Sequence, residues 1–413
     1  MQEDRKDPTP SSALRNRNYL IYLAGSTVSL HGLWVYRVAL GWQAWQLTES
    51  EFWVGVVAFT QFFPMVLFGS LFGVLADRFD RRKASMLINS VSTLIMLALA
   101  GLTAAGLVDV YVLCALSLLQ GVADGAHLPV RLALIPALVP RQQFQSAMAI
   151  NSVAFNLSRF VGPAIAGVLI ALVGVAAAFA FNAVSYIAIL VALAIIKTHP
   201  FRQRPDSRSH VWGELKDGVR YVMASTPLRQ LLGLVAMASF FGRGPLELMP
   251  AFAESVFQRG STGLAILTAA AGAGAIVAGI IISRGIVHLR IRYIAIGIAI
   301  AGCLIILLGV ARQFWLGVAT VTVLGFMLTV CGVGSQVLLQ SMIDDELRGR
   351  VSSLWGMIAF GGTAFGGLVV GAFASLWGLS ATTLAIGVLC MLLTLRIYAR
   401  RLAAGRRDKI RGQ

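Results

Sequence analysis

Hydrophobic residues dominate the chain in twelve long runs, most of them separated by short polar connections. Each run is close to the ~20 residues that an α-helix needs to cross the hydrocarbon core of a bilayer. The pattern therefore predicts an all-α membrane protein with twelve transmembrane helices. Their approximate bounds are 19–42, 52–76, 84–107, 110–138, 147–173, 174–196, 230–256, 263–282, 293–310, 315–339, 351–376 and 380–395.

A polar stretch between the sixth and seventh runs divides the chain. We predict an N-terminal six-helix bundle at 1–196, a cytoplasmic linker at 197–229 and a C-terminal six-helix bundle at 230–413. Within the linker, residues 211–223 show helical periodicity, which indicates a helix lying on the membrane surface.

The two halves are weakly alike. Gly162 and Gly167 recur at the same spacing as Gly366 and Gly371, each pair following a polar connection. A duplicated six-helix half is an architecture of secondary transporters.

Charge in the connections alternates in sign along the chain. One set of connections is basic and holds Arg15, Arg17, Arg78, Arg81, Arg82, Lys83, Arg141, the stretch 197–229, Arg284, Arg290, Arg292, Arg348, Arg350 and the tail after Arg396. The other set holds Glu49, Glu51, Asp109 and Glu254, with Arg259 and Arg312 as its cations. Because cytoplasmic loops carry the excess of Lys and Arg, both termini are expected in the cytoplasm, in a multi-pass protein of the inner membrane.

Composition excludes other classes of protein. Only 13% of the residues are charged, against about 25% in soluble domains, so a soluble enzyme is excluded. The net charge of +16 follows from membrane topology, and we expect no nucleic-acid partner. The four cysteines lie in apolar runs without zinc or disulfide spacing, so no metal and no cofactor are expected.

The most specific motif is the connection after the second run, GVLADRFDRRK at residues 73–83. It resembles the loop signature of the major facilitator superfamily, with Asp80 where most members have glycine. The segments QLTES at 46–50, PVRLALIPALVP at 129–140 and RFVGPAIAG at 159–167 are similar to its enterobactin-exporter-like, or transmembrane secretion effector, branch. The resemblance implies the major facilitator fold, two six-helix bundles whose first, fourth, seventh and tenth helices line a central cavity.

The resemblance also implies a conformational latch. Its residues would be Gly73, Asp77, Arg78, Arg81 and Arg82, with Asp77 accepting hydrogen bonds from the start of the eleventh helix. Alternatively, this cluster only fixes the topology, with its arginines held at lipid phosphates.

RFVGPAIAG is similar to the fifth-helix motif of exporters. Gly162, Pro163 and Gly167 would make a bent and closely packed helix, an antiporter-like motif. Close packing by small residues, without a coupling role, is the alternative reading.

Ionisable residues deep in a membrane helix are costly, and they mark functional sites by default. Asp124, Glu247 and His31 are the candidates for proton coupling. Asp124 could instead form a salt bridge to Arg159 or Arg37, Glu247 could lie solvated at the rim of the cavity, and His31 could be a packing residue. Gly32-Leu33-Trp34 stands where many members of the branch have Gly-Asp-Trp, which shifts the expectation to Asp124 and Glu247 or to looser coupling.

Cations outnumber acids inside the predicted helices, which suits an anionic or phenolic substrate. The candidate residues of the substrate cavity are Arg37, His127, Arg159, Arg243, Gln336 and Gln340.

These patterns predict a secondary active transporter that exports a hydrophobic or amphipathic small molecule by alternating access as a proton antiporter, since the chain has no GxxxxGK[ST] loop. A siderophore is the specific expectation for the substrate. A multidrug or macrolide-type efflux pump, or a lipid flippase of the same fold, is the alternative. An intramembrane enzyme is not expected, because HExxH and GxSxG are absent. The expected partners are the substrate, protons and the lipid bilayer, with the protein acting as a monomer.

Overall fold

The computed structural model describes residues 12–76, 80–197, 211–284, 290–344 and 347–411, and these residues contain helices and no strand. The first half holds η1 (Ala13–Arg15), α1 (Arg17–Thr48), α2 (Glu51–Ala76), α3 (Arg81–Ala104), α4 (Val110–Leu134), η2 (Ile135–Ala137), η3 (Arg141–Gln143), α5 (Phe144–Leu172) and α6 (Val175–Ile195). The second half holds α7 (Val211–Ala224), α8 (Thr226–Met237), η4 (Ala238–Arg243), η5 (Gly244–Leu248), α9 (Met249–Ala251), η6 (Phe252–Val256), α10 (Gly260–Ser283), α11 (Ile291–Val310), α12 (Phe314–Ser341), α13 (Arg348–Trp377) and α14 (Leu379–Arg411).

The predicted membrane helices are confirmed. Eleven segments of the described residues are long and apolar enough to cross a bilayer. The remaining one is α1, whose 32 residues span about 48 Å at 1.5 Å per residue. Its polar side chains lower its hydropathy, but it packs inside the bundle against α5 and α6. With α1, the helices account for all twelve predicted spans.

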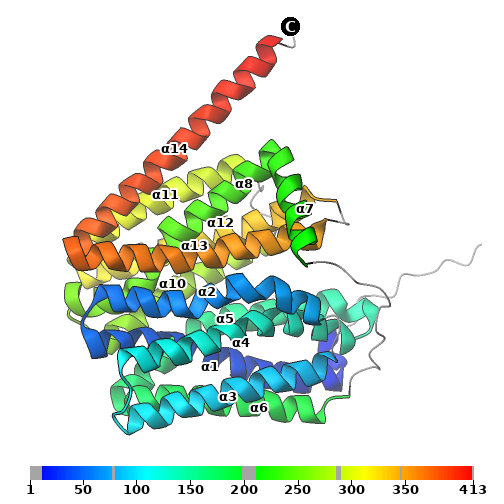
Figure 1. The fold of residues 1–413 in the computed structure, drawn as a ribbon, viewed down its shortest axis with the longest axis vertical. Helices are drawn as coiled ribbons and strands as arrows, with labels where there is room; N and C mark the ends of the chain where they lie inside the picture. Colours follow the sequence, from blue (N-terminus) through cyan, green and yellow to red (C-terminus); the bar gives the residue numbers. More distant parts are fainter. Residues whose placement is uncertain (1–11, 77–79, 198–210, 285–289, 345–346, 412–413) are drawn as a thin grey trace, which may run out of the picture.

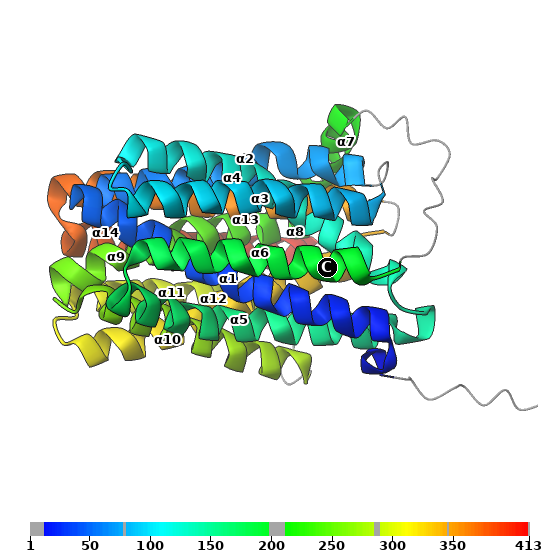
Figure 2. The same cartoon turned by 90° about the horizontal axis from the view of Figure 1, so that it is seen from below.

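The helices form two groups that lie side by side. Figure 1 shows α1 to α6 together, and α8 with α10 to α14 beside them. The helix predicted at 211–223 is present as α7, which lies across one end of the bundle in both views (Figures 1 and 2) and contacts α13 and α2, and its place on a membrane surface remains a prediction. Arg350 of α13 forms an ion pair with Asp217 of α7 at 3.4 Å. The proposed domain boundaries at 196 and 230 remain a prediction.

The two ends of the bundle differ in charge, and we call them the acidic end and the basic end. The acidic end holds the turns after α1, α3 and α5, with Glu49, Glu51 and Asp109. The basic end holds the starts of α1, α3 and α5, with Arg15, Arg17, Arg81, Arg82 and Arg141, and lies on the right in Figures 1 and 2.

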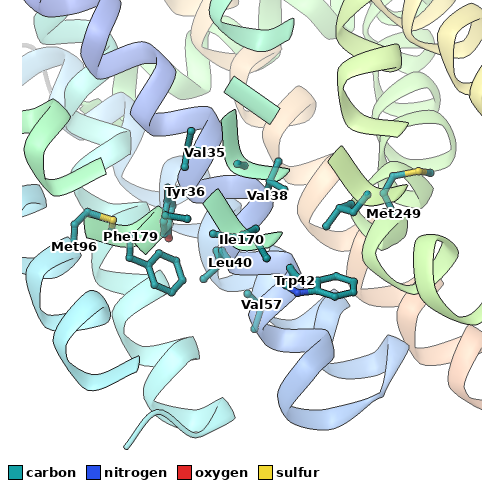
Figure 3. Close-up of a cluster of buried hydrophobic side chains, with 14 of the residues drawn as sticks. Val35, Tyr36, Val38, Leu40, Trp42, Val57, Met96, Ile170, Phe179 and Met249 are labelled. Carbon is teal, nitrogen blue, oxygen red and sulfur yellow. The ribbon is translucent and has the colours of Figure 1, made fainter. Parts of the chain in front are cut away.

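The core of the first group surrounds α1. Tyr36 of α1 is fully buried, and its ring lies 6.2 Å from that of Phe179 of α6. Figure 3 shows these side chains with Met96 of α3 and Val57 of α2 converging on one cluster. At Gly25 an added methyl group would lie 2.7 Å from the Cβ atom of Ala192. Glycine therefore allows α1 to approach α6 closely.

Close contacts join the two groups toward the acidic end. A methyl group at Gly55 of α2 would lie 2.6 Å from the carbonyl oxygen of Gly367 of α13, and Gly167 of α5 abuts Ala265 of α10. Toward the basic end, methyl groups at Gly69 and Gly279 would meet nothing within 4 Å. The groups are therefore closed against each other at the acidic end.

Charged side chains of the connection after α2 cap two helix ends. Asp80 accepts a hydrogen bond from the backbone N–H of Lys83 at 2.9 Å and so caps the start of α3. The guanidinium of Arg82 donates to the last carbonyls of α6, those of Leu193 at 2.6 Å and Ala194 at 2.8 Å. Cations stabilise helix C-termini, because the unsatisfied carbonyls there carry negative partial charge.

Replacing Gly55 by alanine is expected to lower the thermal stability of the purified protein. The new methyl group would press on the Gly367 carbonyl and force α2 and α13 apart, and overpacking of this kind costs about 1–3 kcal/mol. Gly69→Ala in the same helix is the matched control, because it meets nothing within 4 Å. Thermal unfolding in one detergent compares the two variants, and equal midpoints would contradict the close packing.

Candidate functional site

The seventh span, which we call the broken span, stays helical throughout but loses its regular α-helical hydrogen bonding in its middle. After α8, the chain passes through the π-helical η4, the 3-10 helix η5, the short α9 and the π-helical η6. Pro245 and Pro250 lie within this stretch, and proline removes a backbone donor from the helix. Arg243 ends η4 and Glu247 lies in η5. Mid-helix 3-10 stretches and π-helical turns are frequent at functional sites, so this stretch marks a candidate site.

Glycines of α13 hold the broken span in place. A methyl group at Gly244 would lie 2.6 Å from the carbonyl carbon of Gly366, and one at Gly362 would lie 2.7 Å from Cβ of Ser239. A neighbouring face of α13 contacts α2, where a methyl group at Gly371 would lie 2.5 Å from the Glu51 carbonyl oxygen. Thus α13 links the broken span to the other half of the molecule.

Four charged side chains from both halves gather at this level, and we call them the central cluster: Arg37 of α1, Arg159 of α5, and Arg243 and Glu247 of the seventh span. All three guanidinium groups act electrostatically on Glu247. The four side chains are partly buried. Among the described residues, no arginine nitrogen lies within 4.0 Å of the Glu247 carboxylate. The cluster therefore carries three positive charges against one negative charge, without a direct ion pair.

Aromatic rings support the arginines of the first half. The Arg37 guanidinium lies 4.8 Å from the ring centroid of Trp34 and 5.2 Å from that of Phe62. Arg159 lies 5.5 Å from the same Trp34 ring. A guanidinium over an aromatic face is attracted by the ring quadrupole, most strongly where water is excluded. These contacts compensate part of the cost of burying unpaired cations.

Asp124 of α4 belongs to a polar network inside the first half. Its Oδ1 accepts a hydrogen bond from Nε2 of Gln120 at 2.9 Å. The same nitrogen lies 3.2 Å from the Tyr186 hydroxyl and 3.3 Å from the Ser92 hydroxyl, and its two hydrogens can serve two of these three acceptors at a time. Oδ2 of Asp124 has no partner, which leaves one oxygen of the carboxyl group available for another contact.

Arg37 connects this network to the central cluster. It acts electrostatically on Asp124 as well as on Glu247. No ion pair joins Asp124 to Arg37 or Arg159 within 4.0 Å in the described part of the chain. Arg37 is thus a shared neighbour of the two acids, one in each half.

The other predicted site residues lie apart from the cluster or have local partners. Nδ1 of His31 lies 2.7 Å from the Thr27 carbonyl oxygen one turn earlier in α1, the contact of a packing residue. His127 is partly buried on α4, one turn beyond Asp124. On α12, Gln336 is partly buried and Gln340 is exposed. Gln120 and Tyr186 were missed from the sequence, although the spacing of four residues from Asp124 could have indicated Gln120.

The predicted latch is only partly within the described residues. Gly73 lies in α2, whereas Asp77 and Arg78 fall outside the described ranges. The Arg81 guanidinium donates to the Ala133 carbonyl oxygen at 3.1 Å, and Arg82 caps α6. Both contacts join helices of the first half. The latch itself remains a prediction.

The motif of the fifth helix has two packing surfaces. A methyl group at Gly162 would press on Cβ of Trp34 in α1, and one at Gly167 would press on Ala265 in α10. Pro163 lies inside α5. The glycines thus pack α5 against its own half and against the other half, and their role in antiport remains a prediction.

Comparisons with known proteins show the family of the chain. The profile of the family described as transmembrane secretion effector matches residues 8–410. The chain is 24% identical to the staphyloferrin A transporter of Staphylococcus aureus over 387 residues, covering 91% of this chain and 94% of that protein. It is 27% identical to the enterobactin exporter EntS of Escherichia coli O1:K1 over 389 residues, covering 90% of each.

Solved structures resemble the fold at low sequence identity. The nucleoside transporter NupG superposes with a TM-score of 0.73 at 12% identity, covering 93% of this chain and 98% of that one. An inward-facing bacterial homolog of the lysosomal transporter Spinster gives 0.70 at 13% identity, covering 92% and 96%. The chain therefore belongs to the transmembrane secretion effector family and is a multi-pass transporter of the major facilitator type, not an enzyme.

Proposed function

We propose that the protein exports an anionic, siderophore-like small molecule across the cytoplasmic membrane by alternating access. The observation that carries this proposal is the central cluster, in which three guanidinium groups act electrostatically on one carboxylate without a direct ion pair among the described residues. The names of the two relatives, an enterobactin exporter and a staphyloferrin A transporter, support the same class of substrate.

The chemistry of arginine favours an anionic substrate over a cationic drug. A guanidinium presents its N–H groups in a plane and binds carboxylates and similar oxyanions with two parallel hydrogen bonds. Arg37 and Arg159 have rings against them, so an acidic group can still approach the edges. A cationic compound would add to an existing excess of positive charge.

The position of the cluster suits alternating access. Its members come from α1 and α5 of one half and from the seventh span of the other, so a rocking motion would change their separations. The halves are closed at the acidic end. With basic loops on the cytoplasmic side, this arrangement would receive substrate from the cytoplasm.

Inward proton flow would drive export through Asp124. Its carboxyl group has one free oxygen in a buried network. The ionised carboxylate of Asp124 would attract Arg37 toward α4. Once Asp124 is protonated, this attraction is lost, and Arg37 would interact with Glu247 or with the substrate. Protonation would thus redistribute one cation between the two halves.

Replacing Arg243 by glutamine is expected to reduce the kcat/KM for export of enterobactin roughly 10- to 100-fold. A hydrogen bond to a charged group contributes about 1.5–3 kcal/mol, and each 1.4 kcal/mol corresponds to about a factor of ten. Uptake into everted vesicles measures the effect. Arg312→Gln at the acidic end is the control, since Arg312 is exposed and donates to Ser380. An equal loss in both variants, or wild-type transport of a cationic dye or a lipid in place of enterobactin, would contradict the proposal.

Replacing Asp124 by asparagine is expected to abolish the response of transport to a proton gradient, because asparagine cannot exchange a proton. In everted vesicles with an acidic lumen, uptake should fall at least roughly tenfold, while gradient-independent exchange of substrate persists. Asp109→Asn is the matched control, because Asp109 only caps α4 and asparagine caps equally well. Gradient-driven uptake that survives Asp124→Asn unchanged would show that Asp124 is structural.

A further inference from the structure

A chain of contacts between arginines and aromatic rings continues from the central cluster into α4 and α5. Beyond Trp34, the next ring is Phe155 of α5, with the two ring centroids 6.2 Å apart in an edge-to-face arrangement. The Arg131 guanidinium of α4 lies 5.7 Å from the Phe155 centroid. We call Arg131 and Phe155 together the second station.

Arg131 is a buried cation without a counter-ion in the part of the chain that the structure describes, as expected of a residue that binds an anionic ligand. Its side chain is 8% exposed, and its Nε has no hydrogen-bond partner. Among the described residues, no carboxylate oxygen lies within 4.0 Å of it. Burying a cation without a counter-ion is costly, and one aromatic ring compensates only part of that cost. An anion supplied from outside the protein would provide the remainder.

The second station lies nearer the basic end than the central cluster. Phe155 precedes Arg159 by four residues on α5, which places it about 6 Å closer to that end. Arg131 follows Asp124 by seven residues on α4, which is about 10 Å in the same direction. Along their own helices, Phe155 and Arg131 therefore lie one to two turns closer to the basic end than Arg159 and Asp124.

We propose that the second station binds a separate acidic group of the transported molecule, so that the preferred substrate carries at least two anionic or catechol-type groups. This inference rests on the proposed export function and specifies its substrate class. One group would occupy the central cluster while another reaches Arg131 on the side of the basic end. The Phe155 ring would hold the guanidinium in place and leave its N–H edge for the ligand.

The test compares two probes on the full-length protein in nanodiscs. One probe is a bis-catechol amide with two dihydroxybenzoyl groups, and the other is its mono-catechol half. Arg131→Gln is expected to raise the Kd of the bis-catechol at least roughly tenfold and to leave the Kd of the mono-catechol within about twofold. Phe155→Leu should give a smaller shift in the same direction, because the guanidinium loses its supporting ring.

Controls separate binding from folding and from lipid contact. Arg141→Gln removes an exposed cation at the basic end and should change neither Kd. If Arg131→Gln lowers the unfolding midpoint but leaves the bis-catechol Kd unchanged, Arg131 is a structural contact between α4 and α5, and the proposal is wrong while export stands. If the effect of Arg131→Gln on the Kd depends on the anionic lipid content of the nanodisc and not on the probe, Arg131 binds a lipid headgroup. That outcome would also overturn the proposal. If the wild type binds neither probe, the result contradicts the proposed export function itself, on which the second station rests.

Discussion

Unpaired positive charge in the partly buried interior is the constraint on which the rest of this structure depends. Arginine remains protonated under all physiological conditions, so it cannot escape burial by losing its proton. Arg37, Arg159 and Arg243 instead interact electrostatically with Glu247 without a direct ion pair among the residues that the structure describes. The rings of Trp34 and Phe62 cover the guanidinium of Arg37. In the proposed function, a substrate with acidic groups would complete this arrangement and give the site its selectivity by charge.

Close helix packing is what brings these charges together. Without a hydrophobic force between helices in lipid, small residues that let backbones approach supply much of the association energy. On α13, Gly362 and Gly366 contact the broken seventh span, while Gly367 and Gly371 contact α2. Arg243 and Glu247 therefore lie on a segment whose position is tied to the interface between the halves. A motion of that interface would be transmitted directly to the charges.

The membrane helices could be predicted closely from the sequence, whereas the partners of the site residues could not. The bounds of α2, α6 and α11 differ from the predicted runs by at most two residues. The length of a hydrophobic run is a local property of the chain, so the sequence alone gives it. The break at η4 and η5 was not foreseen, because proline and glycine are tolerated in membrane helices with or without a change of geometry.

The sequence by itself determined the number of spans, the polarity of the loops and the presence of Asp124, Glu247 and the buried arginines. Each of these follows from composition within a short window of the chain. Only the tertiary structure decided that Arg37 lies near both acids, that Gln120 and Tyr186 reach Asp124, and that Phe155 links Arg131 to Trp34. Those contacts join helices far apart in the chain, and side-chain reach across a helix interface depends on rotation and depth, which no local pattern of residues specifies.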